Sequence, residues 1–311
     1  MDASVAQSRP LTAIGLRLLA AFSLTTLSML VKLVGEDGVH LFEIIFWRQA
    51  VTLLAMIAFA AATVGFATLK PVRFKSHAIR SAYGIVGMAL VYGAVIMLPL
   101  AEATTLNFTA PIWAVILSML LMRERIGRYR WSAIAIGFAG ILIVAQPGGN
   151  PVDPLGIAVG LGGAFMVALT SIQIQDLNKT ESSVSIVFWF CLLTVPLLAL
   201  ALPFVGRVHS GDTWLLLGGV GMSGAAAQLL LTNSLRFGSA ATVIVMDYTA
   251  LLWATLYGWQ VFDELPVPNT WIGAPLIILA GTIILVREGH LARKARRARV
   301  EVPAPEEPLA R

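Results

Sequence analysis

The composition of this 311-residue chain excludes a water-soluble globular domain, because 58% of its residues are hydrophobic and only 13% are charged. A typical soluble domain has about 25% charged residues, so a polytopic membrane protein is indicated. The net charge of +5 raises the alternative of a nucleic-acid partner. Most cations, however, lie in short segments between apolar runs, where membrane orientation explains them better. The single cysteine, Cys191, excludes a disulfide framework and a cysteine-based zinc site.

Ten apolar segments have roughly the length that an α-helix needs to cross a bilayer. Turn-forming sequences separate several of them, for example at 35–38 and 266–269. The first run is too long for the apolar region of a cleavable signal peptide, and Arg17 interrupts it. The sequence therefore predicts an all-α integral membrane protein with ten transmembrane helices. These lie near residues 11–34, 40–64, 77–98, 101–122, 131–146, 154–175, 182–203, 213–236, 240–261 and 270–286.

The second half of the chain repeats the first at a constant offset of 140 residues. The segment TAPIWA at 109–114 returns as TALLWA at 249–254, and the same offset pairs Glu124 with Glu264. Each unit has five spans, an odd number, so the second must lie upside down relative to the first. Such inverted repeats are typical of secondary transporters, whose substrate site lies near the midplane between the repeats. The predicted organisation is an N-tail at 1–10, repeats at 11–146 and 154–287, a linker at 147–153 and a basic tail at 288–311.

Positive charge is distributed unevenly between the two sides of the predicted bundle. If the N-terminus is cytoplasmic, only Lys32, Arg48 and Arg207 lie within a span or on the other side. Because cytoplasmic loops are enriched in Lys and Arg, both termini are expected in the cytoplasm. The basic tail is expected to be disordered or to lie against anionic lipid headgroups.

Motifs for catalysis are missing from the sequence. It contains no G-x-x-x-x-G-K-[ST], no G-x-S-x-G and no H-E-x-x-H, and its histidines are scattered near span ends. A membrane enzyme needs polar residues gathered at one depth, and no such group is visible. We therefore expect no enzyme activity, no catalytic residue, no cofactor and no metal.

The fourth predicted span carries the clearest candidate for a substrate site. Pro111 lies near its middle, removes one backbone hydrogen bond and clashes with the carbonyl of Asn107, which predicts a kink. The freed carbonyl needs protein or a wet cavity beside it. Thr105, Thr109 and Trp113 are spaced i, i+4, i+8 and share the face beside the kink. We interpret them as a wall of a substrate cavity. The alternative is a kinked helix whose threonines bond its own backbone and whose tryptophan packs.

The ninth predicted span repeats this face with Thr249 and Trp253 and adds Asp247 and Tyr248. Trp253 lies near mid-span, away from the interfacial belts where tryptophan usually anchors a helix. Asp247 is a candidate for carrying a coupling proton, with a structural hydrogen bond as the alternative. Leu251 stands where the first half has its proline, so the two halves are not expected to be functionally equivalent.

Arg48 lies about eight residues inside the second predicted span. A lone arginine at this depth costs about 3 kcal/mol and usually faces the bundle interior. It is a candidate for holding a substrate carboxylate bidentately, and the alternatives are snorkelling or pairing with Glu43. Further candidates for substrate contact inside spans, each with packing as the alternative, are Tyr83, Tyr92, Gln228 and Asn233.

Several short motifs occur in a fixed order along the chain: FWR at 46–48, APIW at 110–113, RER at 123–125 and GFAGILI at 137–143. Together with their echoes in the second half they resemble the drug/metabolite transporter superfamily, in its ten-helix EamA-type branch, over residues 11–287. The resemblance implies an exporter of the bacterial cytoplasmic membrane, with a central cavity walled by spans 3, 4, 6, 8 and 9. Its substrates would be amino acids, purines, sugars or cationic drugs. The chain looks most like the bacterial aromatic amino-acid exporters of that branch.

The prediction from sequence is a secondary transporter that exports aromatic or other neutral amino acids by alternating access. The substrate would stack on Trp113 or Trp253, and Arg48 is the candidate cation for contact with it. Carriers of sugars, nucleobases or drugs are alternatives, and so is a non-transporting membrane scaffold. Facilitated diffusion is as plausible as proton antiport. The expected partners are a small-molecule substrate and membrane lipid, without nucleic acid. Spans 5 and 10 are rich in small residues, which indicates tight packing or, alternatively, a homodimer contact.

Overall fold

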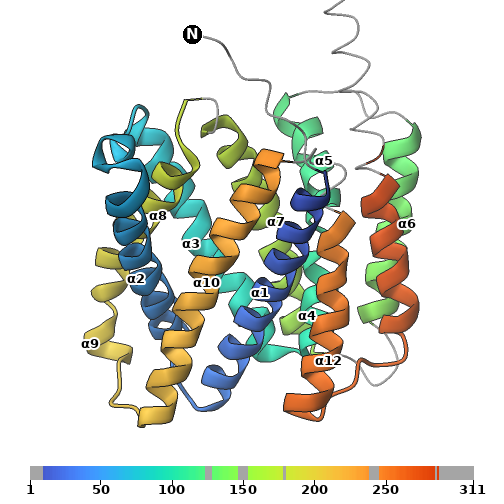
Figure 1. Ribbon diagram of the computed structural model, residues 1–311. Helices are drawn as coiled ribbons and strands as arrows, with labels where there is room; N and C mark the ends of the chain where they lie inside the picture. Colours follow the sequence, from blue (N-terminus) through green and yellow to red (C-terminus); the bar gives the residue numbers. More distant parts are fainter. Residues whose placement is uncertain are drawn as a thin grey trace, which may run out of the picture.

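The computed structural model describes residues 10–122, 128–145, 153–177, 180–237, 245–283 and 286. Within these ranges the regular structure is entirely helical, and the helices lie side by side in one bundle (Figure 1). Five helices are long and apolar enough to cross a membrane: Gly15–Glu36, Leu41–Val64, Phe74–Met97, Pro154–Ile174 and Gly211–Leu230. Shorter apolar helices occupy Trp131–Ile143, Ser183–Ala199 and Thr270–Ile283. The predicted all-α membrane fold is confirmed.

Each of the ten predicted spans overlaps a helix among the described residues. The first half comprises α1 (Pro10–Glu36), α2 (Leu41–Phe59), a π-helical turn (Ala60–Val64), a 3-10 turn (Phe66–Leu69), α3 (Phe74–Met97), α4 (Leu100–Asn107), α5 (Ala110–Met122) and α6 (Arg128–Ala145). The second half comprises α7 (Pro154–Leu177), α8 (Ser183–Ala199), α9 (Leu202–Val205), α10 (Gly211–Phe237), the 3-10 helix η3 (Val245–Thr249), α12 (Ala250–Phe262) and a closing helix, Thr270–Ile283.

The fourth span is broken into two helices. α4 ends at Asn107, and α5 begins at Ala110 after a short turn. Pro111 therefore lies in the first turn of α5, where a missing backbone N–H leaves no helical hydrogen bond unmade. The break also follows from the turn itself, in which the Thr109 amide donates to the Leu106 carbonyl at 3.1 Å.

The ninth span changes its helix type at the equivalent residue, although it has no proline there. The 3-10 helix η3 ends at Thr249, and α12 begins at Ala250. Ala110 and Ala250 thus open corresponding helices in the two halves. Leu251 stands where the first half has a proline, and the ninth span passes from 3-10 to α-helical geometry here without an intervening turn.

Close helix packing surrounds these two spans. α1 packs against α10 and α12, α3 packs against α7, and α2 packs against both α8 and α10. Glycines allow the close approach of α3 and α7, since a Cβ at Gly87 would lie 3.1 Å from Met166 Cβ and one at Gly163 would lie 3.1 Å from the Val91 amide nitrogen. The shared apolar core includes Val31, Ile44, Leu100 and Leu106, all fully buried.

The contact between α6 and the closing helix can be tested at Gly140. An added Cβ there would lie 2.9 Å from the Gly273 carbonyl oxygen and 3.2 Å from the Ile277 amide nitrogen, and backbone atoms cannot move aside as a flexible side chain can. We expect Gly140→Ala to lower the Tm in detergent, at an overpacking cost of about 1–3 kcal/mol. Gly218→Ala is the control, because nothing lies within 4 Å of its added Cβ and alanine favours helix. Equal Tm values for the two variants would contradict this contact.

Candidate functional site

A first group of buried polar and aromatic side chains surrounds the junction of α4 and α5. The Thr109 hydroxyl donates to the Leu106 carbonyl at 2.7 Å, so it is used by its own turn. By contrast, the Thr105 hydroxyl, Asn107 Oδ1 and Trp113 Nε1 are buried and have no hydrogen-bond partner among the described residues. Buried polar atoms are normally paired, so these three are unused donors and acceptors on α4 and α5, the two helices of the fourth span. We call this group the break cluster; it comprises Thr105, Asn107, Phe108, Thr109, Trp113 and Tyr248.

The break cluster joins the broken fourth span to η3 of the second half. The Phe108 ring meets the Tyr248 ring edge-on, with centroids 5.1 Å apart, so the turn after α4 touches η3. The Trp113 ring packs edge-on against Phe165 of α7, with centroids 5.7 Å apart. Aromatic pairs prefer this T-shaped geometry. Trp113 and Tyr248, predicted separately from the two repeats, thus belong to one region of the bundle.

A second group lies between α2, α3 and α8 and contains two arginines, Arg48 and Arg80, which are 5% and 4% exposed. Arg48 Nη1 donates to Gln49 Oε1 at 2.5 Å and lies 3.7 Å from Met88 Sδ. The Tyr92 hydroxyl faces the same guanidinium. The structure therefore brings together Arg48 and Tyr92, two residues that were predicted independently. We call this group the arginine cluster; it comprises Arg48, Gln49, Arg80, Tyr92, Cys191 and Thr194.

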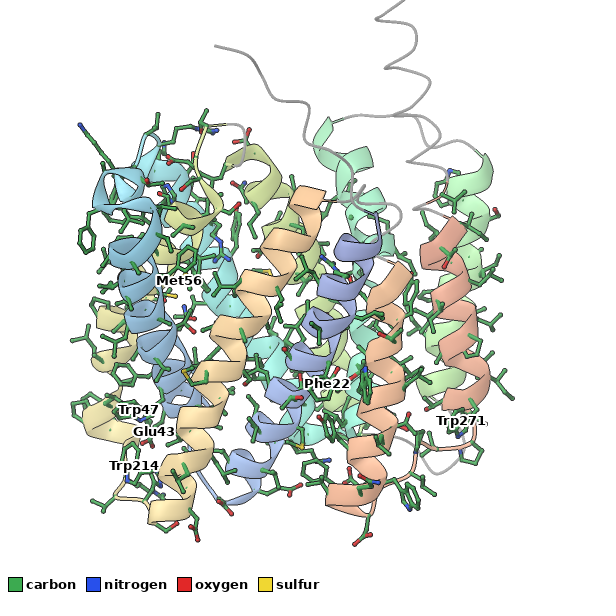
Figure 2. All side chains as sticks on the ribbon, in the orientation of Figure 1. Phe22, Glu43, Trp47, Met56, Trp214 and Trp271 are labelled. Carbon is green, nitrogen blue, oxygen red and sulfur yellow. The ribbon has the colours of Figure 1, made fainter. Side chains whose placement is uncertain are left out.

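Arg80 is a buried charge that the sequence analysis did not include among the candidate site residues. It was grouped with the cytoplasmic cations, but it lies inside α3, with its guanidinium 3.7 Å from the centroid of the Phe190 ring. The suggested pairing of Arg48 with Glu43 is wrong. Glu43 Oε1 lies instead 2.9 Å from His209 Nε2, at the end of the bundle where Figure 2 shows Glu43 beside Trp47 and Trp214.

Two ion pairs fasten α1 to the second half of the chain. Arg17 is bonded twice to Asp247 of η3, through Nε to Oδ1 at 2.6 Å and through Nη2 to Oδ2 at 2.5 Å. Near the other end of α1, Lys32 pairs with Glu264, beyond α12. Asp247, the candidate proton carrier, is thus engaged by a buried arginine. Sequence reasoning missed both pairs, although Arg17 and Lys32 stood out as charges inside an apolar span.

Trp253, Gln228 and Tyr83 contact other parts of the bundle than the break cluster does. The Trp253 ring contacts Phe22 of α1 edge-on, with centroids 5.0 Å apart. It lines an apolar groove with Leu18 and with Leu252, which is 70% exposed. Gln228 lines a separate small cavity between α2, α8 and α10. Tyr83 of α3 is partly buried, and the side chain of Asn233 lies outside the described residues.

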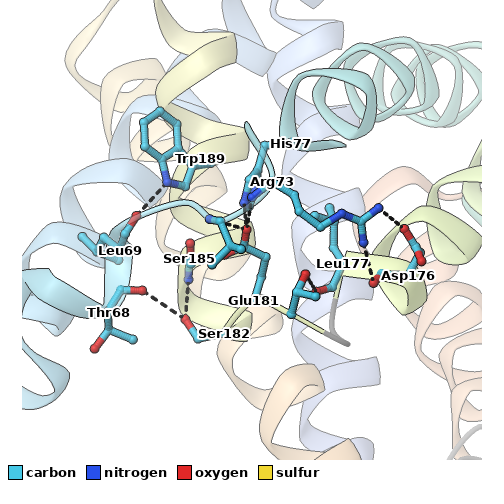
Figure 3. Close-up of polar contacts among 12 residues, drawn as sticks. Thr68, Leu69, Arg73, His77, Asp176, Leu177, Glu181, Ser182, Ser185 and Trp189 are labelled. Carbon is cyan, nitrogen blue, oxygen red and sulfur yellow. Dashed lines mark hydrogen bonds and ion pairs between the residues drawn. The ribbon is translucent and has the colours of Figure 1, made fainter. Parts of the chain in front are cut away.

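Glu181 ties the loop before α8 to the start of α3, as Figure 3 shows. Its Oε1 accepts hydrogen bonds from the backbone amides of Val72 and Arg73, both at 2.8 Å, and lies 3.2 Å from His77 Nε2. Burial by itself raises the pKa of this carboxyl. The two amide hydrogen bonds and the imidazole outweigh burial, so the pKa of Glu181 lies below its ordinary value.

This lowered pKa predicts a loss of stability in acid. The carboxylate stabilises the fold fully above the ordinary glutamate pKa of 4.5, and this stabilisation is lost as the pH falls through the lower folded pKa. We expect Glu181→Gln to lower the Tm at pH 7, and the Tm curves of variant and wild type to converge in acid. Asp176→Asn, at a more exposed carboxylate bonded to Arg73 at 2.6 Å, is the control and should have a smaller effect. A difference between Glu181→Gln and wild type that stays constant with pH would contradict the assignment.

Comparison with known proteins places this geometry in a family. The EamA-like transporter family matches the chain twice, over residues 11–146 and 154–287. A riboflavin transporter of Vibrio cholerae is 30% identical over 231 residues, covering 74% of this chain and 77% of that protein. A pseudopaline exporter of Pseudomonas aeruginosa is 28% identical over 268 residues, covering 85% and 93%. An S-adenosylmethionine uptake transporter of Rickettsia felis is 27% identical over 282 residues, covering 89% and 94%.

The fold has a counterpart among solved structures. One crystal structure superposes with a TM-score of 0.60 over 87% of this chain and 97% of that chain, at 20% identity, which is a likeness of fold. The duplicated family match agrees with the helices that begin at Ala110 and Ala250, one in each half. The chain belongs to the EamA-like transporter family: it is a multi-pass membrane transporter with a two-repeat fold, and not an enzyme.

Proposed function

We propose that this protein is a secondary carrier that exports aromatic or other neutral amino acids by alternating access. The substrate would occupy a central cavity between repeats 11–146 and 154–287. The observation that carries the proposal is the break cluster, where the broken fourth span meets η3 of the second repeat beside buried polar atoms that lack a partner among the described residues. Inverted-repeat carriers place their substrate at such interrupted helices near the midplane.

The chemistry of the break cluster suits a small zwitterion with a flat side chain. Asn107 Oδ1 is an unused acceptor for an ammonium group, and the Trp113 indole N–H is an unused donor for a polar substituent of the substrate. The rings of Trp113 and Tyr248 offer faces and edges to an aromatic substrate. The riboflavin transporter named among the relatives supports a flat ring and makes flavins or nucleobases the second candidate class.

Direction and coupling are part of the same proposal. The relatives include both an exporter and an uptake transporter, and we propose export from a bacterial inner membrane, with both termini cytoplasmic as the cation distribution supports. Asp247 is the candidate for a coupling proton, because protonation would weaken its ion pair with Arg17 and loosen α1 from η3. Facilitated diffusion is the alternative.

Counterflow in liposomes tests this function. The purified protein would be assayed with labelled phenylalanine, threonine, riboflavin, a purine and a sugar, with and without a proton gradient, beside empty liposomes. We expect saturable phenylalanine exchange, and dependence of net flux on the gradient would identify antiport. Flux of riboflavin or purine without phenylalanine would overturn the amino-acid substrate but keep the carrier. No flux of any compound by folded protein would favour a non-transporting scaffold.

A further inference from the structure

Most buried charges in this bundle have partners of opposite charge or neutral hydrogen-bond donors. Arg17 pairs with Asp247, Lys32 pairs with Glu264, and Glu43 meets His209. Fully buried Glu102 accepts hydrogen bonds from the Val267 amide and the Thr270 hydroxyl; these contacts are at 2.9 and 3.1 Å. The two cations of the arginine cluster are different. Across the described part of the chain, no carboxylate lies within ion-pair distance of either one.

The two guanidinium groups lie along one face of α3. Positions 80, 84, 88 and 92 of α3 are spaced four residues apart and share a face. Arg80 Nη1 lies 2.5 Å from where a Cβ of Gly84 would be, so this glycine makes room for the arginine head. Arg48 reaches the same face at Met88 and Tyr92, one and two turns further along. The two arginines are close enough to influence each other electrostatically.

The surroundings fix these cations without neutralising them. Gln49 Oε1 accepts from Arg48, while Gln49 Nε2 donates to Thr194 Oγ1 at 2.8 Å, which links α2 to α8. On α10, Gly224 leaves space for Arg48, whose Nε lies 3.2 Å from the position of an added Cβ. Arg80 rests on the Phe190 ring, and its Nε and Nη1 have no hydrogen-bond partner in the part of the chain that the structure describes. Arg48 Nε is likewise unpaired.

We propose that Arg48 and Arg80 form an anion-binding site between α2, α3 and α8 that takes a carboxylate or phosphate group. Two like charges held together in an apolar interior are unfavourable, and a bound anion relieves both the burial cost and the repulsion. The planar guanidinium presents its donors in the fork that suits carboxylate and phosphate oxygens. That the anion is the acid group of the transported metabolite rests on the proposed carrier function. A free inorganic anion is the other source of the same chemistry.

The site can be tested by ligand-dependent thermal stability of the full-length protein in detergent, at constant ionic strength. Benzoate and benzamide are matched probes, because they share a ring and differ in charge, and inorganic phosphate is the second anion. We expect benzoate or phosphate to raise the Tm saturably and benzamide to leave it unchanged. In Arg48→Gln and Arg80→Gln the half-saturating concentration should rise about tenfold or more, since each removes charge-assisted hydrogen bonds. Arg73→Gln, at a partly exposed arginine, is the matched control and should keep the wild-type response.

Absence of a saturable anion effect in the wild type would overturn the proposal. A wild-type anion response in both glutamine variants would overturn it as well. If the glutamine variants do not fold, Arg80→Lys serves instead. Lysine keeps the positive charge but lacks the planar set of guanidinium donors. Weaker benzoate binding by this variant therefore supports the site, and unchanged binding contradicts it. Competition of benzoate with labelled phenylalanine in counterflow would assign the site to the acid group of the substrate. Binding of phosphate without competition would assign it to an inorganic anion. The Tm result can be interpreted even if no flux is found, so the site and the carrier function fail separately.

Discussion

Replacing Asp247 with asparagine is expected to destabilise the protein by about 3 kcal/mol, as breaking a buried ion pair does. The pair is bidentate, and the side chains of Arg17 and Asp247 are 8% and 31% exposed. The variant keeps the shape of the carboxylate but removes its charge, leaving the buried guanidinium without this counter-ion. The effect is expected at the lower end for such pairs because Asp247 is partly exposed. The loss of stability would be measured as a lowered Tm and as an unfolding midpoint at a lower denaturant concentration.

The matched control for this substitution is Asp176→Asn. The pair of Arg73 with Asp176 has nearly the same length, 2.6 Å, but its side chains are 37% and 41% exposed. Exposed pairs contribute about 0–1 kcal/mol, so this variant should remain close to wild type. If Asp247→Asn proves as stable as Asp176→Asn, the ion pair of Arg17 with Asp247 does not stabilise the contact between α1 and η3. If Asp247 carries the coupling proton, its variant should also lose any dependence of flux on the proton gradient.

Trp113→Ala is expected to reduce phenylalanine flux about tenfold or more per folded molecule. The substitution removes an aromatic contact and an unpaired indole donor, which together contribute about 1–3 kcal/mol to binding. Truncating this partly buried tryptophan also costs stability, up to about 3–5 kcal/mol. Flux must therefore be normalised to the monodisperse fraction on size exclusion.

Two variants separate binding from packing at this position. Trp113→Phe keeps a ring against Phe165 but has no N–H. Its flux is therefore expected to lie between the flux of the wild type and that of Trp113→Ala. Full activity of the phenylalanine variant would contradict a role for the indole donor. Trp131→Ala is the control: this tryptophan of α6 is 55% exposed, and its loss should leave flux unchanged.

The sequence was sufficient to predict the spans, because apolar length and turn chemistry are local properties. It also singled out Arg48, Tyr92 and Trp113, since charge, hydroxyl and indole are uncommon inside apolar helices. Their neighbours were not predictable in the same way. Asp247 lies 230 residues along the chain from Arg17, so their pairing depends on how α1 packs against the second half.

Arg80 shows a second limit of sequence reasoning. It follows a run of cations near the start of a span, and the positive-inside rule explains such residues without any burial. Its position inside α3 depends on Gly84 and Phe190, one on the same helix and one from α8. A glycine one turn after an arginine was the available signal. It marks where a long side chain can lie flat against its own helix.

The fourth and ninth spans differ in one backbone hydrogen at equivalent positions, Pro111 and Leu251. This difference decides whether each span can form a regular α-helix there. Pro111 has no amide hydrogen, so the fourth span can never close the hydrogen bond to the carbonyl of Asn107. Leu251 keeps its amide hydrogen, and the carbonyl of Asp247 stands four residues before it. A fully hydrogen-bonded α-helix is therefore available to the second repeat at this position and not to the first.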